Sequence, residues 1–251
     1  MTEPLNTAPL PPDPVLGAVI SNHPSNRLWP LIIGGIVDGV TYLTLNATLA
    51  TLDTWWAPPL AIILMGIVVL TVAWSILHTW NREIVVFERG FSYREGSKTV
   101  FFHYDEIDAL RMQAERRAYF GGLLRRTMYR FTVHTLAAET FTITNLYTRV
   151  AQLGEQLNQR VDRALIPRLE RKFAAGATVP FGELLSLSAL GLRADERDLA
   201  WEQFGGWEVK ARAIHLKQAD GAVWASIPLT EIDNITVLLH FLRAYQSVRS
   251  G

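Results

Sequence analysis

Two long apolar stretches near the start of the chain dominate its hydrophobic pattern. The first covers residues 28–52 and the second residues 59–80, and residues 60–77 include no charged side chain. A helix needs about 20 apolar residues to cross a bilayer core of about 30 Å. The pattern therefore predicts a transmembrane hairpin over residues 28–80, with antiparallel helices because the link between them is short.

The residues that flank these stretches indicate an orientation. Arg27 precedes the first helix and Arg82 and Arg89 follow the second, whereas the link contains neither Lys nor Arg. Tryptophans, which favour membrane interfaces, stand at the ends of the stretches, at Trp29, Trp55, Trp56 and Trp80. By the positive-inside rule we expect a multi-pass protein of the cell (inner) membrane with both termini cytoplasmic.

Polar and small residues make the first stretch different from the second. Gly35 and Gly39 have the spacing that lets another helix approach closely, and Asp38 and Asn46 lie in the same stretch. These four residues are the predicted intramembrane helix contact, and they suggest an integral-membrane protein partner. Asp38 has two interpretations: a functional contact or proton-relay position, or a carboxyl that is protonated or hydrogen-bonded to the second helix.

Residues 1–27 show neither a helical nor a strand period and are rich in Pro, Asn, Ser and Thr. This composition predicts a flexible N-terminal tail. An apolar patch at Leu16-Gly17 and Val19-Ile20 could dock on the rest of the protein.

After the hairpin the pattern changes to the alternation that is typical of strands. We expect strands at 83–87, 91–94, 99–104, 107–112, 128–135 and 140–144, with a loop between 112 and 128. An amphipathic helix follows from Val150 to Leu165, interrupted at Pro167. Strands followed by a helix indicate an α+β module of antiparallel strands with one face covered.

The same order of signals returns after Ala177. Strands are expected at 181–187, 192–194, 199–201, 207–210, 214–217 and 223–229, and Asn234 is a possible N-cap of a closing helix over 234–248. Two tandem modules explain this echo, and a single larger sheet is the alternative.

The stretches Ile84–Phe91, Tyr104–Ile107 and Gly176–Gly182, with the Gly191-Leu192 and Trp201-Glu202 steps, carry a resemblance. Over residues 81–245 the chain resembles an uncharacterised bacterial family of membrane-anchored proteins with pleckstrin-homology-like domains. The resemblance implies a first such domain with a terminal helix at 81–172 and a second at 173–251. It implies no activity, because the matching residues are turn glycines and core aromatics.

Charge and cysteine content exclude several classes of function. The chain has no cysteine, so thiol chemistry and cysteine metal sites are excluded. Residues 81–172 hold 16 Lys and Arg against 11 Asp and Glu, whereas residues 173–251 hold 7 against 9. The half next to the hairpin is therefore basic, which suits an anionic lipid surface. The whole is too balanced to predict nucleic-acid binding.

One stretch combines arginines with an apolar tip that contains two glycines. Its predicted lipid- or partner-binding residues are Arg116, Arg117, Tyr119, Phe120, Leu123, Leu124, Arg125 and Arg126. Such a loop can insert apolar side chains at a headgroup boundary while its arginines contact phosphates. The alternative is a connection whose apolar tip packs on a neighbouring module.

We find no pattern that predicts catalysis, a metal or a cofactor. His103 and Asp105 share a strand face, which gives two ligands at best, and no nucleophile or phosphate-binding motif is present. We therefore expect a non-catalytic binding or scaffold module at the cytoplasmic membrane face. The alternative is an accessory, cofactor-free subunit of a larger membrane complex, for example an energy-transducing or transport assembly. A membrane enzyme that uses Asp38 or His103 would need a companion group.

Overall fold

The computed structural model describes residues 13–51, 54–119 and 124–250. The described chain forms two compact units: one reaches from the N-terminal side to Phe101 and includes Leu146–Thr148, and the other comprises Phe102–Asn145 and the chain from Arg149 onward. We describe each unit separately.

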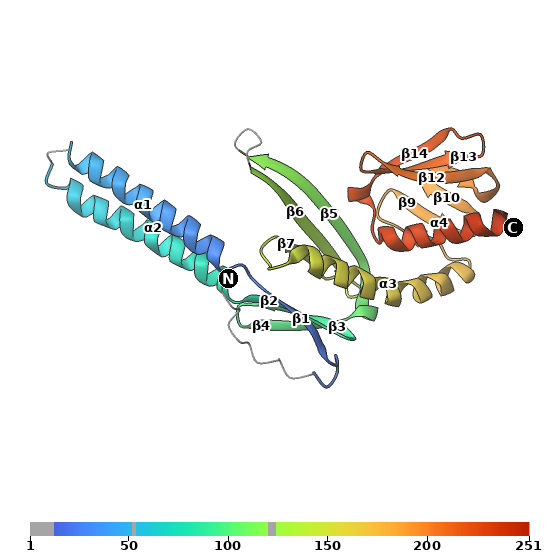
Figure 1. Ribbon diagram of the computed structural model, residues 1–251, viewed down its shortest axis with the longest axis horizontal. Helices are drawn as coiled ribbons and strands as arrows, with labels where there is room; N and C mark the ends of the chain where they lie inside the picture. Colours follow the sequence, from blue (N-terminus) through green and yellow to red (C-terminus); the bar gives the residue numbers. More distant parts are fainter. Residues whose placement is uncertain (1–12, 52–53, 120–123, 251) are drawn as a thin grey trace. The chain divides into compact units, whose positions relative to one another are not determined.

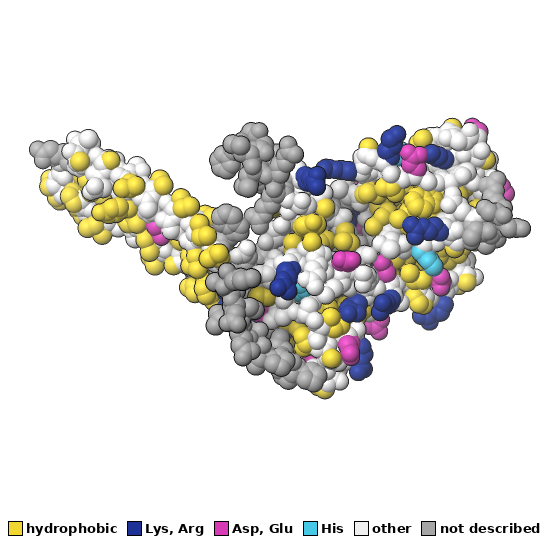
Figure 2. Space-filling model, in the orientation of Figure 1, with side chains coloured by type: hydrophobic (Ala, Val, Ile, Leu, Met, Phe, Trp, Pro, Cys, Tyr) yellow, Lys and Arg dark blue, Asp and Glu magenta, His cyan; other side chains and the backbone are white. Residues whose placement is uncertain are grey.

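The N-terminal unit contains the two expected apolar helices, α1 (Leu28–Leu49) and α2 (Ala57–Trp80), which pack side by side as an antiparallel pair (Figure 1). We call α1 and α2 the helix pair. Both helices are long and apolar enough to cross a membrane, and only 6% of each apolar window is buried. Hydrophobic side chains cover most of the visible surface of the pair (Figure 2).

The helix pair is joined to a four-stranded antiparallel sheet in the order β1-β2-β3-β4. Its strands are β1 (Val19–Pro24), β2 (Arg82–Phe87), β3 (Gly90–Glu95) and β4 (Lys98–His103). Strand β1 precedes the helix pair and β2 follows it, so both helices are inserted between two paired strands.

Strand β1 corrects the prediction of a flexible tail for the part of residues 1–27 that the structure describes. Leu16 is 1% exposed and packs with Val85 and Phe87, as the docking alternative expected. Asp13 shapes the turn before it by accepting hydrogen bonds from the backbone N–H groups of Val15 and Leu16, at 2.8 and 2.9 Å. Strand β1 was not predicted, because its partner strand, β2, follows both helices in the sequence.

The C-terminal unit begins with the one-turn helix η1 (Tyr104–Glu106) and a three-stranded sheet, β5-β6-β7. These strands are β5 (Ile107–Tyr119), β6 (Leu124–Thr135) and β7 (Thr140–Thr144), and Figure 1 shows how far β5 and β6 extend. Helix α3 (Val150–Ala174) packs on this sheet, with Leu153, Leu157 and Leu165 buried.

Helix α3 continues through Pro167, where an interruption was predicted. Proline removes one backbone donor and costs about 3 kcal/mol in a helix interior. The buried stripe nevertheless continues from Leu165 to Leu169, which are 0% and 6% exposed. Burial on both sides of the proline therefore keeps the helix in one piece.

The remaining strands form a second four-stranded and a second three-stranded sheet, in the orders β11-β10-β9-β8 and β12-β13-β14. Their bounds are β8 (Val179–Pro180), β9 (Leu185–Ser188), β10 (Gly191–Ala194), β11 (Arg197–Ala200), β12 (Phe204–Lys210), β13 (Ala213–Gln218) and β14 (Val223–Pro228). The one-turn helix η3 (Trp201–Gln203) links the sheets, and η4 (Leu229–Glu231) leads into α4 (Ile235–Ser250). We call β8–β14 with η3, η4 and α4 the C-terminal module.

Helix α4 closes the C-terminal module. Trp201 stacks on Tyr245 with ring centroids 4.2 Å apart, and its indole N–H donates to the Ser188 carbonyl at 2.9 Å. Val237, Leu238 and Leu242 of α4 are fully buried.

The chain thus presents one succession of elements twice: four strands, a one-turn helix, three strands and a long helix. The same irregularity marks both copies, because the register shifts between Ile107 and Ala109 in β5 and between Phe204 and Gly206 in β12. The described strands form four separate sheets, not the single larger sheet that was the alternative.

Candidate functional site

The first copy contains the helix pair and two strand extensions that the second copy lacks. In the second copy, β8 and β9 are joined by residues 181–184, whereas in the first the whole helix pair stands between β1 and β2. When β5 is matched to β12 at their shared register shift, residues 114–119 and 124–129 have no counterpart. We call these two segments the arm.

The arm is a two-stranded antiparallel ribbon. Strand β7 pairs with β6 only between Arg130 and His134, so β5 and β6 continue beyond it with each other as partners. At a rise of about 3.3 Å per residue, the extra residues add about 20 Å to the ribbon. The ribbon replaces most of the loop that was predicted between residues 112 and 128. The alternation was hard to detect because no apolar face runs along it.

The register places several of the predicted binding residues across from one another. Arg117 pairs with Arg126, and Tyr119 pairs with Leu124. Like charges directly opposite each other destabilise a strand pair unless a counter-charge lies nearby. Of the predicted binding residues, Arg116 is exposed. The side chains of the others in these two strands lie outside the described residues, and Phe120 and Leu123 lie outside them altogether.

Asn145 supports the inner end of the arm from the side of β7. Its side-chain oxygen accepts a hydrogen bond from the Tyr129 N–H at 2.5 Å, and its side-chain nitrogen donates to the Thr127 carbonyl at 3.0 Å. The amide therefore continues the hydrogen-bond pattern of β7 by one step. Asn145 was not predicted, because no local pattern in the sequence identifies it.

The helix pair meets its sheet in a network of short hydrogen bonds. The Ser25 N–H donates to the Arg82 carbonyl at 2.9 Å, so the entry to α1 and the exit from α2 are adjacent. His23 is 1% exposed, and its Nδ1 lies 2.9 Å from the Thr148 carbonyl oxygen. A carbonyl only accepts, so Nδ1 carries the proton, and Nε2 can accept from the Ser21 hydroxyl at 3.0 Å.

Charged and aromatic residues surround this base of the helix pair. The Arg82 guanidinium forms an ion pair with Glu95 and lies 2.8 Å from the His78 Nε2. Arg27 lies over the Trp80 ring, 5.2 Å from its centroid. Burial raises the pKa of the Tyr147 hydroxyl well above its usual value, so this group stays neutral. Arginine beside tryptophan at a helix end is typical of a membrane interface.

The predicted intramembrane contact residues divide between two faces of α1. Asp38 is half-buried beside α2, and its Oδ1 is buried with no hydrogen-bond partner among the described residues. Gly35, Gly39 and Asn46 are exposed, and a Cβ added to either glycine would meet nothing within 4 Å. These three residues leave a surface of α1 open.

The glycine that allows α1 to approach α2 is Gly34, which was not among the predicted contact residues. A Cβ at this position would lie 2.6 Å from Cγ1 of Val72. The less exposed positions of α1 are 30, 34, 38, 41, 45 and 49, and their spacings of three and four are those of a helix-pair seam. That spacing could have predicted the face of α1 that contacts α2, whereas the Gly-x-x-x-Gly pattern predicted a contact on the other face of α1.

Two threonine hydroxyls of α1 form hydrogen bonds within the helix. Thr44 donates to the Val40 carbonyl at 2.8 Å and Thr48 to the Thr44 carbonyl at 2.9 Å. Such bonds remove most of the cost of exposing these groups to lipid. The threonines therefore do not argue against a membrane location for α1.

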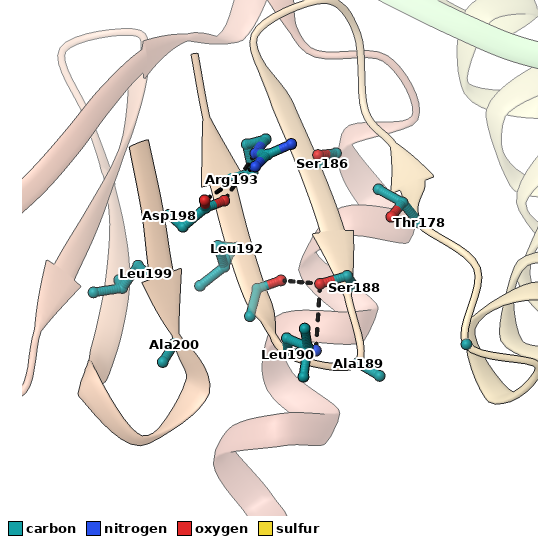
Figure 3. A pocket seen from close by; sticks show the side chains of 12 residues that line it. Thr178, Ser186, Ser188, Ala189, Leu190, Leu192, Arg193, Asp198, Leu199 and Ala200 are labelled. Carbon is teal, nitrogen blue, oxygen red and sulfur yellow. Dashed lines mark hydrogen bonds and ion pairs between the residues drawn. The ribbon is translucent and has the colours of Figure 1, made fainter. Parts of the chain in front are cut away.

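A hollow of about 460 Å³ lies over the outer face of β8–β11 (Figure 3). The Ser188 hydroxyl donates to the Gly191 carbonyl and accepts from the Leu190 N–H, both at 3.3 Å. Arg193 already forms a two-point ion pair with Asp198, at 2.8 and 3.0 Å. Among the described residues that line it, the hollow therefore offers hydroxyls but no unpaired charge and no nucleophile with an adjacent base.

The His103 region has a structural role. The His103 N–H donates to the Glu106 carboxylate at 2.9 Å, which caps η1. The Asp105 carbonyl accepts from the Arg168 guanidinium at 2.8 Å. Among the residues that the structure describes, no group of three or more His, Asp or Glu side chains could hold a metal ion.

Fold and geometry together define a class: a chain with an apolar helix pair inserted into the first of two similar sets of antiparallel sheets. The chain belongs to a family of unknown function, DUF6585, which matches residues 13–250. No curated protein and no solved structure matches the chain.

Proposed function

We propose that this protein is a membrane-anchored, non-catalytic binding module. The observation that carries the proposal is the helix pair, whose apolar windows are only 6% buried over helices with candidate spans of 20 and 24 residues. A rise of 1.5 Å per residue makes such helices about 30 to 36 Å long, enough for a bilayer core. Water would be a poor solvent for so much apolar surface.

Arg27 and Arg82 define the cytoplasmic end of the helix pair in this proposal. They stand at the entry to α1 and just after the exit from α2, and Trp80 lies beside them. The positive-inside rule then puts both chain ends and both sets of sheets in the cytoplasm, with the link after α1 on the opposite side. The location is the cell (inner) membrane.

The repeated order of four strands, three strands and a closing helix supports pleckstrin-homology-like domains as the fold of both copies. The first copy begins at β1 in this proposal, and the helix pair occupies its first strand-to-strand connection. The second copy corresponds to the C-terminal module. The two copies resemble pleckstrin-homology-like domains in the order of their elements, and this resemblance implies no ligand by itself.

The arm is the proposed contact with anionic lipid headgroups. It is the second addition to the first copy, and it contains Arg116, Arg117, Arg125 and Arg126. Phosphates would supply a counter-charge for the like charges that the register places at Arg117 and Arg126. Each arginine near an anionic surface contributes about 1 kcal/mol. Four arginines would therefore dominate the preference for anionic over neutral bilayers.

The test uses the full-length protein in lipid nanodiscs. Because the chain contains no cysteine, Gly121→Cys carries a single environment-sensitive dye, and Asp220→Cys in a turn of the C-terminal module is the control position. We expect the Gly121 dye to shift to the blue in anionic nanodiscs and to lose the shift when the four arginines become alanine. Equal spectra in neutral and anionic nanodiscs would refute lipid contact by the arm.

The second candidate is an accessory subunit of a larger integral-membrane complex, such as an energy-transducing or transport assembly. The open face of α1 with Gly35, Gly39 and Asn46 favours it, because small residues allow a further helix to pack closely. Purification in mild detergent followed by mass spectrometry tests this idea. A protein that purifies alone as a monomer would argue against it.

A further inference from the structure

Strand β5 leads from the body of the protein into the arm, and the C-terminal module closes its outer edge. The backbone N–H of Asn234 donates to the Leu110 carbonyl at 3.0 Å, and its side-chain oxygen accepts from the Leu110 N–H at 2.8 Å. Its side-chain nitrogen donates to the Asp108 carbonyl at 3.2 Å. One residue of the C-terminal module therefore acts as a partner strand for β5.

Asn234 suits this position for two reasons. Its φ is +50°, a left-handed conformation that asparagine adopts more readily than most residues. Its side chain is 4% exposed, so water cannot replace the bonds that it makes. The Leu238 N–H donates to the Asn234 carbonyl at 3.0 Å, so the residue also begins α4, but its side chain serves β5.

Two further contacts continue along β5 toward the arm. The Arg111 guanidinium binds the Asp233 carboxylate at 2.7 and 3.3 Å, and these side chains are 22% and 14% exposed. The hydrogen bond to Asp233 raises the pKa of Arg111, so the guanidinium stays charged. The Gln113 side chain donates to the Thr230 carbonyl at 3.2 Å, one residue before the arm begins.

These contacts matter because a two-stranded ribbon is only marginally stable by itself. Beyond Arg130 no third strand pairs with the arm among the residues that the structure describes, and Asn145 supports it as far as Thr127. The direction of the arm is therefore fixed at its base, by β7 and Asn145 on one side and by the segment from Thr230 to Asn234 on the other.

We propose that Thr230, Asp233 and Asn234 form a latch through which the C-terminal module sets the direction of the arm. This inference rests on the proposed function, because it assigns the C-terminal module a regulatory role toward the lipid contact. Opening of the latch would release the arm. Thr230, Asp233 and Asn234 are positioning residues in this scheme, and the arm makes the contact.

Hydrogen exchange of the full-length protein in detergent micelles tests the latch without any lipid. The variants are Asn234→Gly, which keeps the left-handed backbone accessible, and Arg111→Gln, which acts from the β5 side. Losing a buried hydrogen-bond partner should speed exchange of the β5 amides about ten- to a hundredfold. Asp198→Asn is the matched control, because it breaks a two-point arginine pair that does not touch β5.

Faster exchange confined to β5 and the arm, with β9 and β10 still protected, would support the latch. Unchanged exchange in β5 for Arg111→Gln would overturn it, even if Asn234→Gly unfolded the C-terminal module. Spin labels at Ala118→Cys and Asp220→Cys give a second readout, a narrow distance distribution that the variants should broaden. Both measurements lack lipid, so they remain decisive whether or not the arm binds anionic bilayers.

Discussion

Asp162 makes the stability of the protein depend on pH in an unusual direction. It lies on α3 facing α4, is 8% exposed, and accepts a hydrogen bond from the Asn158 side chain at 3.0 Å. Asn158 also donates to the Thr236 hydroxyl at 3.1 Å. Burial raises the pKa of Asp162 from 3.8 to about 6, although a hydrogen bond from Thr236 opposes the shift.

The sign of the effect follows from proton binding. Because the folded carboxyl holds its proton more tightly than the unfolded one, the folded state binds more protons between pH 3.8 and about 6. Stability therefore falls as pH rises through this window and stays low above it. The full shift corresponds to about 3 kcal/mol, and solvent screening at the carboxyl edge reduces this to about 1 to 2 kcal/mol.

Asp162→Asn keeps the shape of the neutral carboxyl and removes the ionisation. We expect its thermal midpoint at pH 8 to exceed that of the natural protein by about 3 to 6 °C, and to match it at pH 4. Differential scanning fluorimetry in micelles measures both values, with Glu155→Gln on the exposed face of α3 as the control. An equal gain at both pH values, or a loss at pH 8, would refute the reasoning.

Three further expectations concern packing and the inserted helices. Gly34→Leu should separate the helices and cost about 2 kcal/mol in micelles, whereas Gly39→Leu should leave the fold intact and abolish only the partner binding that we proposed for the open face of α1. Gly154→Val should lower the thermal midpoint, because an added Cβ would lie 2.2 Å from Phe131 Cζ; an unchanged midpoint would contradict close packing there. Replacing residues 26–81 by a short turn should give a protein that remains monodisperse without detergent, and aggregation on gel filtration would count against this design.

The elements with strong local signals were predictable from the sequence. The two helices with long apolar stretches occur where expected, and several antiparallel sheets and long helices follow them. The elements that depend on distant partners were not predictable. Strand β1 pairs with β2 across both helices, and α3 passes Pro167 because Leu169 is buried beyond it.

The candidate site was also predictable only where the sequence has a local signal. The cluster of arginines was visible in the sequence, but its placement on a paired ribbon was not, because apolar and polar residues do not alternate regularly over residues 114–119 and 124–129. Asn234 was predicted as a helix cap, and its side chain instead bonds to β5, more than a hundred residues earlier in the chain. No local pattern contains that contact.

The position of the helix pair between β1 and β2 also bears on biogenesis. A flexible connection of about 60 residues would cost about 4 kcal/mol to close. Two inserted helices bring the ends together, as the 2.9 Å bond between Ser25 and Arg82 indicates. We proposed that both helices cross the bilayer. If only one of them did, β1 and β2 would lie on opposite sides of the membrane and could not pair. Formation of the first sheet would thus report correct insertion, and a misinserted chain would leave the edges of β1 and β2 unpaired.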